Sequence, residues 1–211
     1  MRIQHTRVSV RVPATSANLG PGYDSLGLAL DLCDDLAVEA TTGGVEVAVE
    51  GEGAQSLPAG EEHLVVQALR RGLDHAGAPQ TGLRLRAVNR IPHGRGLGSS
   101  AAATVAGLLL ARGMLAEPEA LDDQTVLQLA TEFEGHPDNA APALLGGVVL
   151  SWMQGTAARA VPGGLEIFTY KNVGDRVKPG KLFSDKGYMG TTIAPLASPE
   201  VRHDGQIVAV V

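Results

Sequence analysis

Three glycines stand directly before an alanine-rich run in the segment IPHGRGLGSSAAATVAG, which covers residues 91–107. Gly94, Gly96 and Gly98 permit positive φ angles and close approach of the backbone to a ligand, while the residues from Ser99 to Ala116 predict a helix. The first amides of a helix lack internal partners and, together with the helix dipole, attract an anion. The segment therefore predicts a phosphate site, with Ser99 and Ser100 as helix caps or as hydroxyl ligands of a metal. A glycine-rich turn with a serine cap is the simpler alternative.

Other phosphate-binding signatures do not fit this segment. No Gly-Lys-Ser/Thr follows the glycines, which excludes a Walker loop, and the glycine spacing differs from the dinucleotide fingerprint. The His-Arg-Asp and Asp-Phe-Gly signatures of protein kinases are absent from the sequence.

Composition limits the classes of protein that this chain can represent. Its 211 residues allow one or two domains. The net charge of −6 without a basic block argues against nucleic acid as a partner, and the sequence contains no apolar run long enough to cross a membrane. Cys33 is the single cysteine and cannot form an internal disulfide, and the first residues lack a secretory signal. We therefore expect a cytoplasmic protein.

Periodicity predicts a mixed order of strands and helices. In RVSVRV, valines alternate with polar residues as in a half-buried strand, and Pro13 is expected to end it. A Gly43-Gly44 turn before the alternating residues 45–51 predicts a hairpin. Further strands are expected in LGLALDL, DLAVEA, GLRLRAV and LLGGVVLSW, and further helices in residues 61–77 and in the region that closes at Gly135. This order favours an α+β fold over a regularly alternating one.

Three segments together resemble one family. PHGRGLGSSAAA resembles the phosphate-binding motif of the GHMP kinases, VPATSANLGPGYDSLGLALDL (12–32) resembles the N-terminal motif of homoserine kinases, and EGHPDNAAPALLGGVVLS (134–151) resembles their third segment. The resemblance covers about residues 1–155. It implies the GHMP kinase N-terminal domain, which is ribosomal protein S5 domain 2-like and contains a left-handed βαβ crossover. It also implies ATP-dependent phosphorylation of the side-chain hydroxyl of L-homoserine, a step in threonine biosynthesis.

The resemblance assigns nucleotide and metal ligands. Ser100 is expected near Mg²⁺, with Glu134 as the carboxylate ligand and Glu132 as its alternative; a solvated helix face is the simpler explanation for both glutamates. The phosphates of ATP are expected against Pro92, His93, Gly94, Arg95, Gly96, Leu97, Gly98, Ser99, Ser100, Ala101 and Ala102.

The resemblance also assigns the acceptor site. Asn18, Asp24, His136 and Asn139 are expected to contact L-homoserine, with Asp24 facing its ammonium group; ordinary turn or surface roles are the alternatives. Asn139 and Ser100 are the expected catalytic residues. Several GHMP relatives keep an aspartate base where Asn139 stands, so the resemblance implies direct transfer to a hydroxyl held by hydrogen bonds. Asp138 receives no role as a base.

Residues 156–211 differ from the preceding part and lack the second GHMP half. PGGLEIFTYKNV and PLASPEVRHDGQIVAVV resemble a segment of the molybdenum hydroxylase large subunit, which implies a short foreign α/β piece. Without the second half, an apolar patch should be exposed on the first. Three interpretations stay open: a homoserine kinase impaired by truncation or fusion, a non-catalytic ATP-binding fragment, and a fragment of a molybdenum hydroxylase fusion. A homodimer is compatible with the first.

Overall fold

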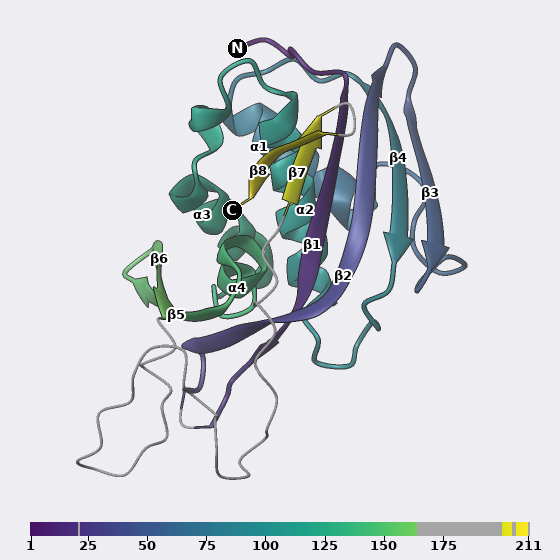
Figure 1. Cartoon of the computed structure of the whole chain (residues 1–211). Helices are drawn as coiled ribbons and strands as arrows, with labels where there is room; N and C mark the ends of the chain where they lie inside the picture. Colours follow the sequence, from purple (N-terminus) through teal and green to yellow (C-terminus); the bar gives the residue numbers. More distant parts are fainter. Residues whose placement is uncertain (21, 164–199, 204–205, 211) are drawn as a thin grey trace, which may run out of the picture.

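A computed structural model describes residues 1–20, 22–163, 200–203 and 206–210 (Figure 1). The strands are β1 (Arg7–Ala17), β2 (Leu26–Thr41), β3 (Val45–Gly51), β4 (Gly82–Asn89), β5 (Val148–Gln154), β6 (Ala157–Gly163), β7 (Glu200–His203) and β8 (Gln206–Val210). The helices are α1 (Leu64–His75), α2 (Ser99–Met114), α3 (Asp123–Glu134) and α4 (Ala140–Leu145), with a short 3₁₀ helix η1 (Pro118–Leu121).

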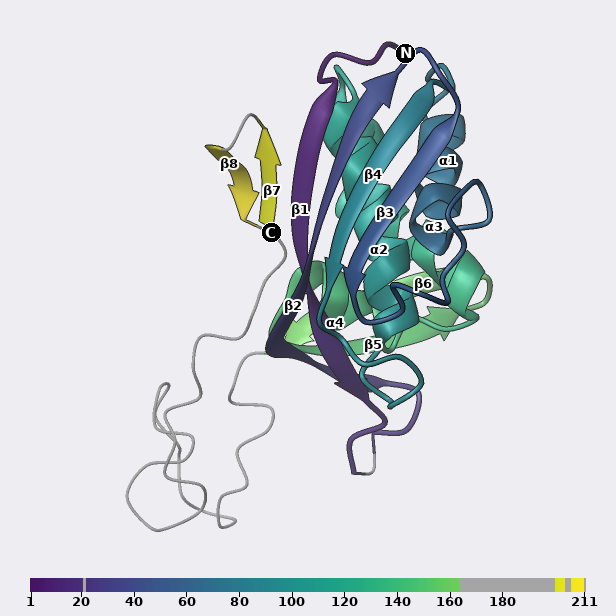
Figure 2. The ribbon, with the colours of Figure 1, turned by 90° about the vertical axis from the view of Figure 1, so that its right-hand side faces the viewer.

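The strands form one sheet with helices on one of its faces (Figure 2). Its order is β3-β4-β2-β1-β7-β8, while β5 pairs with the start of β2 and with β6. Among the described strands, β3 and β4 form the parallel pair, and α1 lies between them in the chain. This is a βαβ unit within an otherwise antiparallel sheet, as expected for an α+β fold; its handedness stays a prediction.

Strand β1 confirms the alternation predicted from RVSVRV but not its end. Val8, Val10 and Val12 are buried. The strand continues through Pro13 to Ala17, so the predicted stop at Pro13 is wrong. Pro13 lies opposite Cys33 and Ala14 opposite Leu30, so the ladder shifts register between them. A proline is tolerated there because a bulge does not require its missing N–H.

The hairpin predicted at Gly43-Gly44 is also wrong. The turn connects β2 to β3, but β4 lies between these two strands and pairs with both of them. Residues 45–51 therefore form a strand of the predicted type with a different partner. A hairpin requires only a local turn, whereas β4 begins at Gly82, after α1, and takes the place between β2 and β3 that a hairpin would close.

Helix α2 forms the centre of the core. It is buried along nearly all of its length and packs against β1, α1 and α3. Small residues make this possible: a Cβ added to Gly107 would collide with the carbonyl oxygen of Val65 and lie 2.7 Å from the Cβ of Ala68. The predicted helix from Ser99 is confirmed, although it ends at Met114 rather than Ala116.

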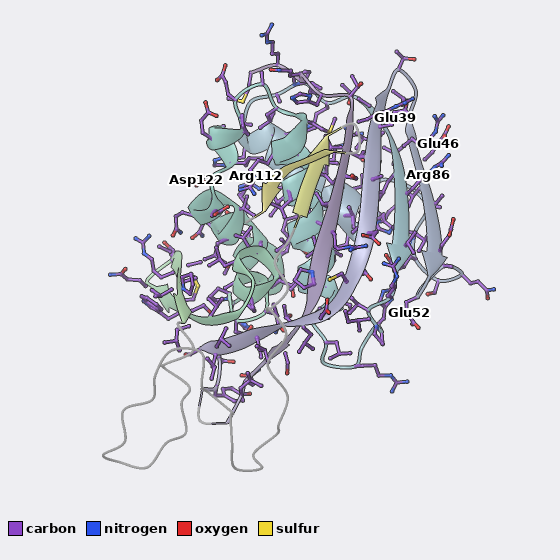
Figure 3. All side chains as sticks on the ribbon, in the orientation of Figure 1. Glu39, Glu46, Glu52, Arg86, Arg112 and Asp122 are labelled. Carbon is purple, nitrogen blue, oxygen red and sulfur yellow. The ribbon has the colours of Figure 1, made fainter. Side chains whose placement is uncertain are left out.

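Charged side chains cover the outer face of the sheet. Arg7 pairs with Glu39 at 2.9 Å across β1 and β2, and Arg84 pairs with Glu46 at 3.0 Å across β4 and β3. Figure 3 shows Glu39, Glu46 and Arg86 on this part of the sheet. Cross-strand ion pairs on a solvated face each contribute little to stability. None of the described helices combines the length and the apolar character needed to span a membrane.

The β5–β6 hairpin exposes large apolar side chains. Trp152 is 43% exposed and Val161 is 47% exposed. Val161 lies opposite Leu150, two residues before Trp152, so both exposed side chains belong to one face of the hairpin. The two side chains give this hairpin an exposed apolar surface.

The end of the chain contributes backbone pairing to the described structure. Strand β7 pairs antiparallel with β1, from Val8 opposite His203 to Arg11 opposite Glu200. The predicted domain boundary after residue 155 falls in the turn between β5 and β6 and stays a prediction. The resemblance to molybdenum hydroxylases rests largely on residues 164–199, which lie outside the described residues.

Replacement of Gly107 by alanine tests the packing of α2. On an exposed helix, Gly→Ala stabilises by roughly 1 kcal/mol, but here the added methyl group meets the backbone of α1. We expect Gly107→Ala to lower the free energy of unfolding by about 1–3 kcal/mol, measured by urea denaturation followed by circular dichroism. Gly44→Ala, where nothing lies within 4 Å, is the matched control. A Gly107→Ala variant as stable as the parent chain would contradict this packing.

Candidate functional site

The glycine loop adopts the positive φ angles predicted from its sequence. Gly94, Gly96 and Gly98 have φ angles of 65°, 71° and 63°. Gly98 is the N-cap of α2, and no side chain of the described residues caps the helix. The predicted capping role of Ser99 and Ser100 is therefore wrong, because a left-handed glycine occupies the cap position instead.

The amides around this cap have no hydrogen-bond acceptor among the residues that the structure describes. Within the part of the chain that the structure describes, no backbone N–H from Gly94 to Ala101 donates a hydrogen bond, and Ala102 begins the helical series by donating to the Gly98 carbonyl at 2.8 Å. A loop of unpaired amides at a helix N-terminus is suited to bind phosphate oxygens. Arg95 is exposed beside them, without an ion pair to another described residue.

Strand β1 fixes the end of this loop. The amide of Thr15 donates to the carbonyl of Leu97 at 3.0 Å. A Cβ on Gly98 would collide with the hydroxyl of Thr15 and lie 3.1 Å from Oδ1 of Asn139. Only glycine fits at this position, both for its φ angle and for the space available.

Ser100 and Glu134 are brought together at the start of α2. The hydroxyl of Ser100 donates to Oε1 of Glu134 at 2.6 Å, and that of Thr104 lies 3.4 Å from the same oxygen. Glu132 instead pairs with Arg71 at 3.1 Å. Hydroxyl and carboxylate oxygens suit Mg²⁺, so the geometry favours Glu134 over Glu132 as the metal ligand.

A pocket of about 200 Å³ adjoins the loop. It lies between the N-termini of α1 and α2, with Ser99 and Ser100 on one side and His63 on the other. His93, one of the predicted loop residues, also lines it. Its remaining walls are Asp34, Leu36, Leu57, Leu64, Val65, Asn89 and Ala103. The mixture of aliphatic walls and a few polar groups is typical of a small-molecule site.

Two buried titratable groups line the pocket with perturbed pKa values. Burial, and then the neighbouring His93, lower the pKa of His63. Burial raises the pKa of the Asp34 carboxyl, against the opposing hydrogen bonds from the Arg90 and Ile91 amides. His63 caps α1 by accepting from the Val65 amide through Nδ1 at 3.3 Å. The neutral ring therefore carries its proton on Nε2, which is buried without a partner among the described residues.

A buried carboxylate joins the residues predicted for the acceptor site. Oδ1 of Asp138 lies 2.5 Å from Nδ1 of His136 and accepts from Nδ2 of Asn139 at 3.3 Å, while its Oδ2 accepts from Asn18 at 3.3 Å. The backbone amide of Asp24 donates to Oδ1 of Asn18 at 2.7 Å. All four predicted residues therefore gather at one place, around an aspartate that is itself completely buried.

Sequence reasoning missed three residues of this site. Asp138 was assigned no role, although its position inside HPDN was the available signal. Thr15 lies in the same N-terminal motif as Asn18, and His63 directly precedes a predicted helix, as a capping residue does. Neither signal predicts the site, because the groups that both residues contact lie far away in the chain. Pro92 and the buried Ala101 and Ala102 belong to the loop and its helix as predicted.

Part of the chain matches a known protein family. Residues 63–147 match the family described as GHMP kinases N terminal domain. The mevalonate kinase structure from Methanococcus jannaschii shares the fold, with a TM-score of 0.55 at 19% identity over 76% of this chain and 57% of that one. The α+β fold described above is that of the GHMP kinase N-terminal domain.

The more similar relatives are homoserine kinases. That of Streptomyces coelicolor is 56% identical over 155 residues, which are 73% of this chain and 50% of the relative, and that of Mycobacterium tuberculosis is 55% identical over 146 residues, 68% and 46%. The structure of homoserine kinase from Cytophaga hutchinsonii has a TM-score of 0.65 at 32% identity, covering 75% of this chain and 52% of that one. The chain thus spans about half the length of the curated relatives it matches.

The pocket histidine predicts a pH dependence of stability. Because the folded pKa of His63 lies below its ordinary value of 6.5, the unfolded chain binds more protons as the pH falls through that value. The free energy of unfolding should therefore decrease between pH 7.5 and pH 5.5, by at most about 1.4 kcal/mol per pH unit for one proton. His63→Asn, which keeps a good cap, should show a shallower decrease in urea denaturation. Equal slopes for both proteins would contradict a buried neutral His63.

Proposed function

We propose that this chain carries the nucleotide-binding half of a homoserine kinase, which transfers the γ-phosphoryl group of ATP to the side-chain hydroxyl of L-homoserine. One observation carries the proposal. Within a segment 56% identical to a homoserine kinase, the unpaired amides of residues 94–101, the Ser100–Glu134 pair and the cluster around Asp138 come to one end of the fold.

The nucleotide is proposed to lie across the starts of two helices. Its phosphates bind the loop amides at α2, where the helix dipole adds to the attraction. Its base enters the adjoining pocket, where Nε2–H of His63 supplies a donor that no described residue pairs, and Leu36 and Leu57 supply apolar walls. Phosphoryl transfer requires mainly positioning and charge neutralisation, which this arrangement supports.

The oxygen ligands at the start of α2 fit Mg²⁺. Ser100 and Glu134 would hold the ion beside the loop. When bound, Mg²⁺ neutralises negative charge on the phosphates. The Ser100 hydroxyl donates to Glu134 at 2.6 Å, so the two oxygen ligands lie close together.

The acceptor is proposed to bind at the cluster around Asp138. The Asp24 carboxylate suits the ammonium group of an amino acid, while Asn18, His136 and Asn139 offer hydrogen-bonding groups. Both oxygens of Asp138 are engaged by neighbouring side chains, which favours a role in orienting them over one as a base. Asn139 then holds the acceptor hydroxyl, whose oxygen forms the new bond to phosphorus as the bond to ADP breaks, and the hydroxyl proton passes to an oxygen of the transferred phosphoryl group.

Binding and turnover are separable in this chain. Because it spans about half of its relatives, a fragment that binds ATP without transferring phosphate is the second candidate function. A fragment of a molybdenum hydroxylase has no support from the described residues and is not proposed further. A cytoplasmic location and a homodimer stay predictions.

Nucleotide affinity tests the metal site. We expect the chain to bind Mg-ATP in isothermal titration, and Glu134→Gln to weaken binding about tenfold or more, because one charged oxygen ligand is lost. Ser100→Ala should weaken it less. Glu132→Gln is the matched control, since its carboxylate pairs with Arg71, and should bind as the parent does. If Glu132→Gln weakens binding and Glu134→Gln does not, the assignment of the metal ligand is wrong.

Product formation tests the proposed reaction. In a coupled ADP assay with Mg-ATP, we expect slow ADP release that increases with L-homoserine and is lost in Asn139→Ala. If the chain binds Mg-ATP but ADP release does not depend on L-homoserine, the chain is a non-catalytic ATP-binding fragment. Absence of both binding and release would contradict both candidates.

A further inference from the structure

A buried hydroxyl connects the glycine loop to the predicted acceptor site. Thr15 is completely buried in β1, beyond the register shift at Pro13. Its amide holds the Leu97 carbonyl at 3.0 Å, and its hydroxyl fills the space beside Gly98. The same hydroxyl donates to Oδ1 of Asn139 at 2.9 Å. One side chain therefore contacts both parts of the site.

This contact fixes which way the amide of Asn139 faces. Its oxygen accepts from Thr15 and its nitrogen donates to Oδ1 of Asp138 at 3.3 Å. Rotating the amide by half a turn would place its oxygen against the Asp138 carboxylate, where two acceptors repel one another. Thr15 and Asp138 together thus hold a single orientation of Asn139.

We propose that Thr15 is a positioning residue that couples the nucleotide-binding loop to the side-chain amide of Asn139. The inference rests on the proposed function, since a phosphate in the loop is what would act on Gly98. A shift of Gly98 displaces the hydroxyl packed against it, and the hydrogen bond carries the displacement to Asn139. Threonine is required because the hydroxyl donates to Asn139 while the rest of the side chain stays packed in the core.

The test follows the side-chain amide of Asn139 by NMR while the full chain is titrated with Mg-ATP. The resonance is assigned by its loss in Asn139→Ala. In the parent chain, we expect this resonance to shift with the same apparent affinity as the backbone amides of residues 94–98. Thr15→Val, which keeps the shape but removes the hydroxyl, should retain the response of the loop and lose that of Asn139. Thr15→Ser should restore the Asn139 response.

A matched control separates coupling from the loss of any buried hydroxyl. The Thr81 hydroxyl is buried without a hydrogen-bond partner among the described residues, and Thr81→Val should leave both responses unchanged. If Thr15→Val does not fold, Thr15→Ala takes its place in the same comparison. An Asn139 response that persists in the folded Thr15 variant overturns the coupling and leaves the proposed function intact. No loop response in the parent chain overturns the proposed function and the coupling with it.

Discussion

The close burial of helix α2 is the constraint on which the rest of the structure depends. A helix enclosed by β1, α1 and α3 must present small residues where a neighbouring backbone approaches, as Gly107 does beside Val65. Its sides are therefore apolar, and the backbone groups without a partner inside the helix lie at its two ends. The amino end emerges at a glycine loop where no described group pairs with the amides. The stability of the core and an anion-binding surface thus come from the same element.

The polar groups around this helix end come from segments far apart in the chain. Thr15 of β1 donates to Asn139, which follows α3, at 2.9 Å, and Ser100 of α2 donates to Glu134 at the end of α3 at 2.6 Å. The completely buried side chain of Asp138 depends on such contacts, because a buried polar group without hydrogen bonds is unfavourable. Asn18 and Asn139, from two different segments, both donate to it. Each of these contacts restricts a side chain before any ligand arrives, which lowers the entropy lost on binding.

The sequence predicted the local features well and the long-range ones poorly. The positive φ at Gly98, the start of α2 at Ser99 and the burial of Val8, Val10 and Val12 all follow from residue type and periodicity. The predicted end of β1 at Pro13 was wrong because β2 bulges opposite this proline and the strand continues. The predicted hairpin at Gly43-Gly44 was wrong because β4 pairs with β3 in place of β2. The positions of Thr15 and His63 in the site depend on contacts across the fold, which no local pattern encodes. The roles assigned to the site residues by resemblance stay predictions, although the structure gathers them.

The exposed side chain on the β5–β6 hairpin has a practical consequence. Trp152 is the single tryptophan of the chain and lies partly in solvent opposite Arg159. Its intrinsic fluorescence therefore reports on the hairpin and not on the start of α2. A chain that covers the hairpin would move the emission to shorter wavelength by excluding water from the indole. The protein thus contains a built-in optical reporter for assembly at this surface, independent of events at the glycine loop.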